Sequence, residues 1–266
     1  MAKRIREPAV AGFFYPDDAD ALREEVRACL AAGRRRLRDT QEAPKALIVP
    51  HAGYVYSGPI AGTAYAAIAP IAERIERVVL LGPSHRVAFR GLALSSADAF
   101  RTPLGDVPLD GAGAAALAEL RQVDVYDAAH AEEHSLEVQL PFLQVALGRF
   151  VLLPIVAGDA TPAEVAEVIE ASWGGPETLL VVSSDLSHYY DYATAASLDR
   201  ATSAAIEALH PDGVGEESAC GRVPVRGLLV AAAKHALAAR TLDLRSSGDT
   251  AGPRDRVVGY GAYAFA

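Results

Sequence analysis

The sequence contains only two cysteines among 266 residues, Cys29 and Cys220. Two cysteines cannot build the disulfide framework of a small secreted protein, so we expect a protein of the reducing cytoplasm. Cys29 lies within the helical pattern DALREEVRACLAAG and is interpreted as a small buried apolar residue.

Long apolar runs are also absent from the sequence. No apolar stretch approaches the roughly 18 residues that a membrane-spanning helix requires, so no membrane segment is expected. Lys3, Arg4 and Arg6 resemble the start of a signal peptide, but Pro16 and the acidic residues after it interrupt the apolar stretch that follows. We therefore expect no targeting segment.

Positive charge is scarce, with 25 Lys and Arg residues against 34 Asp and Glu residues and a net charge of −9. This balance argues against a nucleic-acid-binding surface. The one basic cluster stands at the end of a helical pattern, where it complements the helix dipole; it comprises Arg34, Arg35, Arg36 and Arg38.

Apolar residues make up 51% of the chain, enough for a large core. Four Val/Ile/Leu-rich runs predict strands that are buried on both faces, at 45–50, 77–81, 150–158 and 177–185. An antiparallel excursion is predicted within 91–110, and shorter or alternating strands at 123–126, 241–247 and 257–266.

Helical patterns separate most of these strands. They are predicted at 17–37, from Gly58 onward, and at 110–121, 135–147 (with a possible kink at Pro141), 161–173, 192–209 and 225–239. The first residues, REPAVAGFFYP, predict an irregular arm that packs its aromatic side chains onto the body. Because strands and helices alternate without a linker or repeat, we predict a single α/β domain over residues 1–266, with a largely parallel or mixed central sheet flanked by helices.

Histidines follow three of the predicted strands. His51 comes directly after ALIVP, His85 after VVLLGPS and His188 after LLVVSSDLS. In α/β folds, ligand sites form beyond the carboxyl ends of such strands. Imidazole is the commonest metal ligand and the usual acid or base near neutral pH, so the pattern predicts a metal site or a proton-transfer site.

Three other polar residues stand near these turns. Asp185 could orient an imidazole or could only cap a turn. Cys220, which precedes Gly221 and a predicted helix, could be a soft-metal ligand or an inert buried thiol. His134 stands beside the helix start predicted at Ser135, from where it could reach the same crevice.

Two familiar catalytic motifs are absent. The segment HAEEH, residues 130–134, is not the HExxH of zinc proteases, because its glutamates stand at the third and fourth positions. No GxSxG elbow accompanies Ser183 or Ser184, so a serine nucleophile is not indicated.

The chain resembles the Memo family, whose prokaryotic members are called AmmeMemoRadiSam system protein B. Six segments carry the resemblance, in the expected order: VPHAGYVYSG, LGPSH, EEHSLEVQLPFL, SSDLSHY, ACGRVPV and VGYGAYAF. The resemblance implies a fold similar to that of the class III extradiol dioxygenases, the LigB-like non-haem iron enzymes. It also implies that His51, His85 and Cys220 bind the metal. The polar groups that it places around the same pocket are His134, Asp185 and His188.

The implied function is that of a metal-binding protein, with Fe(II) or copper as the cofactor and a dioxygenase-like oxidoreductase activity. In this interpretation His188 and His134 handle protons or bind dioxygen or substrate, and Asp185 assists them. The dioxygenases hold iron with two histidines and a glutamate, whereas Cys220 here makes the site softer and favours copper or a redox-tuned iron.

The sequence leaves alternatives open. They are a non-catalytic protein that handles metal or binds a partner or peptide, and a metal-assisted hydrolase. A small molecule or peptide is the ligand expected in the metal crevice. The family name further implies a functional association with an AMMECR1-like protein and a radical-SAM protein.

Overall fold

A computed structural model describes residues 3–37 and 42–266 of the chain; Arg38 of the basic cluster lies outside these residues. Twelve strands and eight α-helices are formed within the described residues. The strands are β1 Ile5–Arg6, β2 Ala46–Val49, β3 Arg77–Pro83, β4 Leu92–Leu94, β5 Ala99–Thr102, β6 Gly105–Pro108, β7 Val123–Val125, β8 Val151–Ala157, β9 Thr178–Ser183, β10 His188–Tyr190, β11 Ala239–Ser246 and β12 Val257–Phe265. The α-helices are α1 Ala19–Arg34, α2 Tyr54–Ala66, α3 Gly111–Leu117, α4 Ala128–Ala131, α5 Leu140–Leu147, α6 Pro162–Ala171, α7 Tyr192–Glu207 and α8 Arg222–Lys234.

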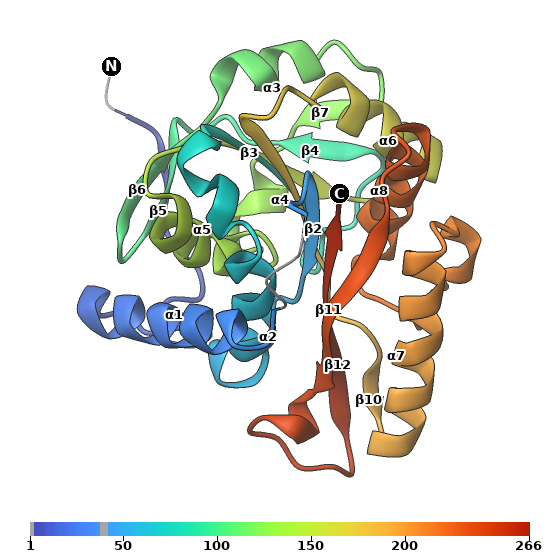
Figure 1. Cartoon of the computed structure of the whole chain (residues 1–266). Coiled ribbons are helices and arrows are strands. Elements are labelled where there is room, and N and C mark those ends of the chain that lie inside the picture. Colours follow the sequence, from blue (N-terminus) through green and yellow to red (C-terminus); the bar gives the residue numbers. More distant parts are fainter. Residues whose placement is uncertain (1–2, 38–41) are drawn as a thin grey trace.

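A nine-stranded mixed sheet forms the centre of the molecule (Figure 1). Its middle is the parallel set β2-β9-β3-β8, and antiparallel strands extend it on both sides. On one side of the sheet, β4 pairs with β8. On the other side, the long strand β12 pairs with β2 and β10 along one of its edges, and with β11 along its other edge. The predicted α/β fold with a mixed central sheet is confirmed.

Helices cover both faces of this sheet, α1, α2 and α5 on one and α6, α7 and α8 on the other (Figure 1). Successive side chains of a strand point to opposite faces. In β2, Leu47 and Val49 join the core under α2, whereas Ala46 and Ile48 join the core on the α8 side. All four are fully buried, which explains why the run ALIV is continuously apolar instead of alternating.

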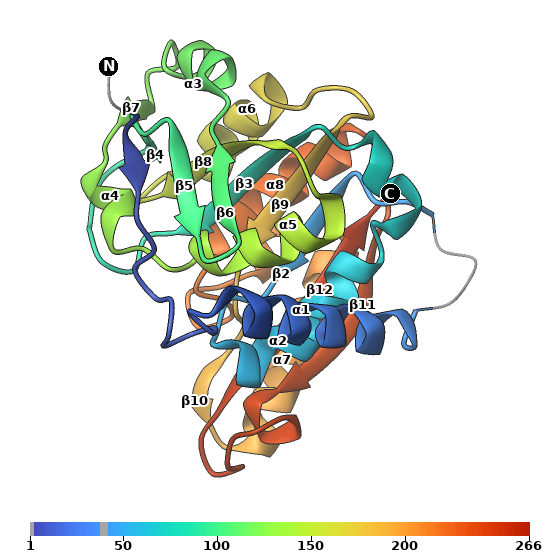
Figure 2. The same cartoon turned by 90° about the vertical axis from the view of Figure 1, so that its left-hand side faces the viewer.

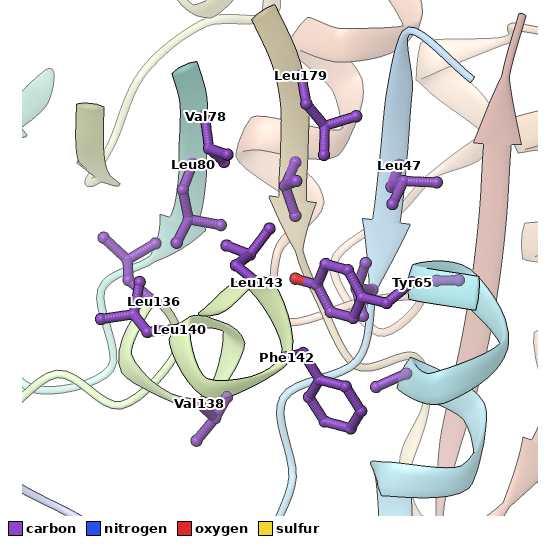
Figure 3. Close-up of a cluster of buried hydrophobic side chains, with 14 of the residues drawn as sticks. Leu47, Tyr65, Val78, Leu80, Leu136, Val138, Leu140, Phe142, Leu143 and Leu179 are labelled. Atoms are coloured by element: carbon purple, nitrogen blue, oxygen red, sulfur yellow. The ribbon is translucent and has the colours of Figure 1, made fainter. Parts of the chain in front are cut away.

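The core between α5, α2 and the sheet is shown in Figure 3. Phe142 of α5 stacks on Tyr65 of α2, with ring centroids 5.3 Å apart, and Leu80 of β3 belongs to the same core. These side chains are fully buried, so truncation of Leu80 to Ala should cost about 2–5 kcal/mol of the free energy of unfolding.

A second, three-stranded sheet of β1, β5 and β6 lies at the side of the molecule (Figure 2). Strands β5 and β6 form the antiparallel excursion predicted from the sequence. The N-terminal arm, residues 6–15, runs from β1 past the central sheet. Its Tyr15 is buried, but the expectation that the arm packs all its aromatic side chains is wrong for Phe13, which is 88% exposed.

Two predicted helix starts are displaced. The helix expected from Gly58 begins at Tyr54, because the Tyr54 N–H donates to the Phe14 carbonyl at 2.7 Å and its hydroxyl donates to the Val138 carbonyl at 2.6 Å. These long-range bonds carry no local sequence signal. The helix expected from Ser135 begins only at Leu140, after a 3₁₀ turn, and Pro141 sits in its first turn instead of kinking it.

Gly58 therefore lies inside α2. The helices α1 and α2 cross at close range, and a Cβ at Gly62 would lie 2.4 Å from the Cys29 carbonyl oxygen. Cys29 is buried at this crossing, as predicted, and both cysteines are free thiols. None of the helices within the described residues is long and apolar enough to cross a membrane.

Candidate metal centre

The carboxyl ends of three adjacent parallel strands define the site. Strand β9 lies between β2 and β3, and each of the three delivers a polar residue two positions after its end. These residues are His51 after β2, His85 after β3 and Asp185 after β9. The crevice predicted at the ends of the strands is therefore formed.

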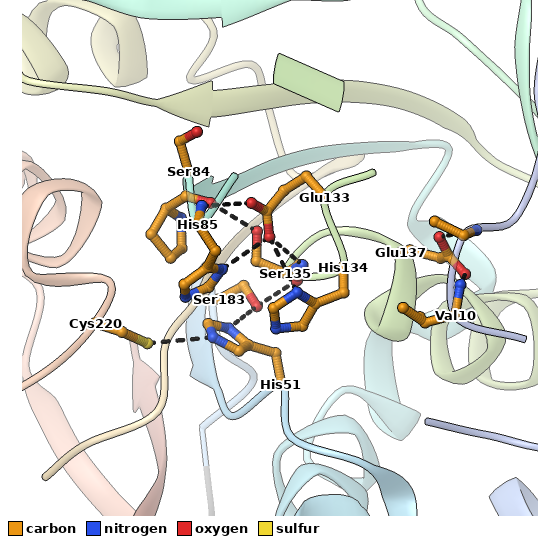
Figure 4. A network of polar contacts seen from close by, with 12 residues as sticks. Val10, His51, Ser84, His85, Glu133, His134, Ser135, Glu137, Ser183 and Cys220 are labelled. Carbon is orange, nitrogen blue, oxygen red and sulfur yellow. Dashed lines mark hydrogen bonds and ion pairs between the residues drawn. The ribbon is translucent and has the colours of Figure 1, made fainter. Parts of the chain in front are cut away.

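Three imidazoles converge there. His51, His85 and His134 each offer a ring nitrogen, and these nitrogens all lie within 4.8 Å of one another (Figure 4). The ring centroids of His85 and His134 are 4.6 Å apart, and those of His51 and His85 are 5.1 Å apart. Such a group could hold a transition-metal ion.

Hydrogen bonds orient the His51 ring. Its Nδ1 lies 2.9 Å from Ser183 Oγ, whose single hydrogen is donated to the Ser135 carbonyl at 2.6 Å. Ser183 Oγ also accepts a bond from Gln139 Nε2 at 2.8 Å. His51 Nδ1 must therefore be the donor toward Ser183, so Nε2 carries the lone pair that a metal would take and that the Cys220 thiol faces at 3.2 Å.

A carboxylate orients the His85 ring in the same way. Glu133 accepts from the His85 backbone N–H at 2.6 Å and from Nδ1 at 2.8 Å. Burial alone would raise the pKa of Glu133, but the bonds from His85 and from the Ser135 N–H lower it to about 2. A carboxylate only accepts hydrogen bonds, so Nδ1 donates and Nε2 of His85 is the nitrogen left for a metal.

His134 completes the cluster from the chain segment before α5. Its Nδ1 lies 3.4 Å from Glu133 Oε1 without hydrogen-bond geometry. Its ring packs between His85 and Phe14 of the arm, whose ring centroid is 4.8 Å away. Burial lowers the pKa of His134 to about 4 and that of His51 well below its usual range, so both are neutral, as metal ligands must be.

Cys220, the third ligand implied by the family resemblance, lies beside His51 but outside the group of three ring nitrogens that lie within 4.8 Å of one another. Its Sγ is 3.2 Å from His51 Nε2 and accepts a bond from the Asp185 N–H at 3.3 Å. Helix α8 follows Gly221, as predicted, but begins at Arg222, three residues before the expected start at 225. Burial raises the pKa of the Cys220 thiol, so its ionisation at neutral pH would need a bound cation.

Asp185 and His188 line the same pocket but do not bond to each other. The Asp185 carboxylate accepts from the His51 backbone N–H at 2.7 Å, and burial raises its pKa to about 7. Of the two interpretations of Asp185, the orientation of an imidazole by its carboxylate is thus not seen for His188. Burial lowers the pKa of His188, which stands at the start of β10 and faces the cluster from the side of β12.

The pocket around these groups has a volume of about 960 Å³. Its walls come from the arm, the turns after β2, β3 and β9, the strand β10 and the segment before β12. Aromatic and cationic side chains line its outer part, among them Phe13, Tyr56, Arg86, Tyr189 and Arg256.

The residues that orient the histidines were not found by sequence reasoning. In the sequence Glu133 stands out only as part of the HAEEH segment, and Ser183 only as a serine without a GxSxG elbow. Gln139 carried no signal at all, because its role depends on a bond to a residue 44 positions away. His130 does not join the site, because its Nε2 contacts the Ala93 carbonyl at 3.0 Å.

The fold and the site together define an α/β protein with a histidine cluster at the carboxyl ends of its parallel strands. Residues 6–264 match the family of Memo-like proteins. The chain belongs to this family.

Relatives match over nearly their whole length. A MEMO1 family protein of Methanopyrus kandleri is 38% identical over 98% of both chains, and one of Aquifex aeolicus is 37% identical over 97% of both. An uncharacterized protein of Escherichia coli K12, known from a crystal structure, is similar in fold. Its TM-score is 0.54 at 15% identity, over 84% of this chain and all of the other.

Proposed function

We propose that the protein is a Memo-family metalloprotein that binds Fe(II) or copper and acts as an oxidoreductase of the dioxygenase-like type. The observation that supports it most is the convergence of three imidazoles whose ring nitrogens lie within 4.8 Å of one another. Two of them have Nδ1 committed to Ser183 and Glu133, which is the usual arrangement of histidines that bind a metal.

The donor set fits a redox-active transition metal. Imidazole suits iron, copper and zinc alike, whereas a thiol softens a site in favour of copper or a redox-tuned iron. Cys220, with Sγ 3.2 Å from His51 Nε2, supports the softer choice. When bound, the metal would supply redox and Lewis-acid chemistry at the wall of the pocket.

The protein's own groups would bind and orient a ligand beside that metal. His51 and His85, together with His134 or Cys220, form the ligand set that we propose. Asp185 and His188 would hold or transfer a proton. Burial raises the pKa of the Asp185 carboxyl to about 7, so it can carry a proton near neutral pH. Burial lowers the pKa of His188, so its neutral imidazole can accept one. Phe14 and the pocket walls would limit the access of water.

Metal analysis with single variants tests this proposal. Anaerobic titration of the wild type with Fe(II) or copper should give one ion per chain. His51→Ala, His85→Ala and His134→Ala should each abolish stoichiometric binding while circular dichroism shows an intact fold. His235→Ala is the matched control, because His235 stacks on Trp173 outside the pocket. Full affinity in His134→Ala would move the third ligand to Cys220.

Dioxygen consumption separates the candidate activities. The iron or copper form should consume dioxygen with a member of a catechol-like substrate panel, and the zinc form should not. Hydrolysis by the zinc form would instead indicate a metal-assisted hydrolase. Tight metal binding without any turnover would indicate a metal-handling or partner-binding protein. The cytoplasmic location and the association with AMMECR1-like and radical-SAM proteins stay predictions.

A further inference from the structure

The backbone of Tyr189 is strained at the edge of the pocket. Within the described residues, three non-glycine residues have positive φ: Tyr189 (66°), Leu209 (50°) and Ala236 (55°). Leu209 and Ala236 directly follow the C-caps of α7 and α8, where a left-handed residue is the common way to end a helix. Tyr189 ends no helix, and a bulky side chain rarely adopts this conformation.

The strained residue changes which side chains face the pocket. In a regular strand, neighbouring side chains point to opposite faces. Strand β10 instead has a register shift against β12 at Tyr189, since His188 pairs with Val258 and Tyr190 with Val257. As a result, His188, Tyr189 and Tyr190 all line the pocket. The bulge therefore brings one extra aromatic ring, which is 64% exposed, to the ligand side.

An arginine lies over this ring. The Arg256 guanidinium is 5.2 Å from the centroid of Tyr189, and within the described residues it has no hydrogen-bond or carboxylate partner. Of the two carboxylates at the same rim, Glu216 pairs with Arg222 at 3.2 Å, whereas Glu217 accepts a bond from the neutral Tyr190 hydroxyl at 3.0 Å and keeps its negative charge. Arg86 and Arg256 both line the pocket, so within the described residues an anion meets two guanidinium groups against one rim carboxylate that has no cationic partner.

We propose that Tyr189 and Arg256 form the ligand-recognition wall of the pocket and select a small anion with a flat apolar body. The Tyr189 ring would stack on the body, and Arg256 would take the anionic group, for which a guanidinium fork suits a carboxylate. The strain at Tyr189 is then retained because it places the ring. This inference rests on the proposed function, since it names the ligand class of the same site.

Stability and binding of Tyr189 variants distinguish a recognition role from a structural one. Glycine accepts positive φ without strain, so Tyr189→Gly should keep or raise the melting temperature. The same variant should weaken binding of the probe benzoate about tenfold, measured by calorimetry. Tyr189→Phe retains the ring and should bind benzoate like the wild type. A lowered melting temperature with unchanged benzoate affinity in Tyr189→Gly would overturn the proposal.

Charge recognition has its own matched pair. Arg256→Gln should weaken benzoate binding about tenfold or more, the loss expected when a charged hydrogen-bond partner is removed. Arg254→Gln should not, because Arg254 lies over Tyr192, 3.5 Å from Asp249, and does not line the pocket. Benzamide, the neutral isostere, should bind more weakly than benzoate and be insensitive to Arg256→Gln. Equal affinity for benzamide and benzoate, or no saturable benzoate binding, would overturn the proposal.

Each titration is run on metal-loaded and on metal-free protein. Benzoate binding that depends on Arg256 in both forms supports the recognition wall even if no turnover is ever found. If the protein binds benzoate but no metal, the proposed function is wrong and the ligand-recognition wall is still supported. If benzoate binding depends on the metal and not on Arg256, the ligand-recognition wall is wrong and the metal site is still supported.

Discussion

Glu133 is the residue on which the geometry of the histidine cluster depends most. Its carboxylate holds both the backbone and the ring of His85 and lies 3.4 Å from the ring of His134. Carboxylates that hold metal-binding histidines raise their basicity and fix their tautomer. A change at Glu133 should therefore act on metal affinity more than on the fold.

We expect Glu133→Gln to lower metal affinity by about 10–100-fold, the usual effect of losing such a partner. An amide accepts with only one of its two terminal atoms, so it cannot serve the His85 N–H and Nδ1 together. Competition with a chromophoric chelator measures the change. Glu132→Gln is the control, since Glu132 is exposed. An equal loss in both variants would exclude this role for Glu133.

For Cys220 the expectation concerns its ionisation. Burial raises the pKa of this thiol, so coordination should release a proton and produce a sulfur-to-metal charge-transfer band with Cu(II) or Fe(III). Both signals should disappear in Cys220→Ser and persist in Cys29→Ser, because Cys29 is buried between α1 and α2. A band that survives in Cys220→Ser would mean that the thiol is only a neighbour of the metal.

Among the elements, the N-terminal arm depends on one buried carboxylate. Glu137 forms an ion pair with Arg6 and accepts from the Ala9 N–H at 2.8 Å, the Val10 N–H at 3.0 Å and the Tyr15 hydroxyl at 2.6 Å. These bonds fix both ends of the arm and so place Phe14 against His134. The arm is thus an extension of the site, although it lies far from it in the sequence.

Arg6→Met should lower the free energy of unfolding by about 3 kcal/mol, because it leaves the Glu137 carboxylate buried without its cation. Three neutral donors remain, which keeps the loss near the lower end of the range for a broken buried pair. Urea unfolding measures it, and limited proteolysis should show earlier cleavage within residues 7–15. Arg4→Met, at an exposed arginine, should change stability by less than about 0.5 kcal/mol. Equal stabilities of the two variants would contradict this account.

At the scale of the whole molecule, a buried carboxyl on α7 makes stability depend on pH. Burial raises the pKa of Asp199 from 3.8 to about 6 in the folded state, although it accepts a bond from the Ser187 N–H at 3.0 Å. A carboxyl with a raised folded pKa favours the folded state while it is protonated. Its contribution is complete below pH 3.8 and is lost as the pH rises to about 6.

We therefore expect Asp199→Asn to gain stability relative to the wild type as the pH rises from about 4 to 6, with a constant difference above that. The amide oxygen can still accept from Ser187, so the loop before β10 should keep its place. Urea unfolding at a series of pH values measures the difference in unfolding free energy between the variant and the wild type. Asp185 also has a raised pKa, but it is present in both proteins, so its contribution cancels in this difference. A difference that does not change with pH would contradict the raised pKa.

Much of the fold and part of the site could be predicted from sequence. The runs at β2, β3, β8 and β9 are apolar on both faces, and that pattern alone predicts a buried sheet. The same runs place His51 and His85 because each histidine follows its strand directly. The start of α2, the contacts of Glu133 and the bulge at Tyr189 could not be predicted. Each depends on bonds between distant segments, for which local propensity carries no information.

The position of β12 has a consequence for biosynthesis. This strand contributes the last residues of the sheet, up to Phe265, and pairs with β2, β10 and β11. Its Gly259 also exchanges backbone hydrogen bonds with Leu186 and Ser187, which lie in the loop between Asp185 and His188. A growing polypeptide therefore lacks one wall of the crevice until residue 265 has left the ribosome. Ribosome-bound chains arrested before β12 should remain protease-sensitive and unable to retain metal. The cell would thus acquire its metal site only after synthesis of this strand.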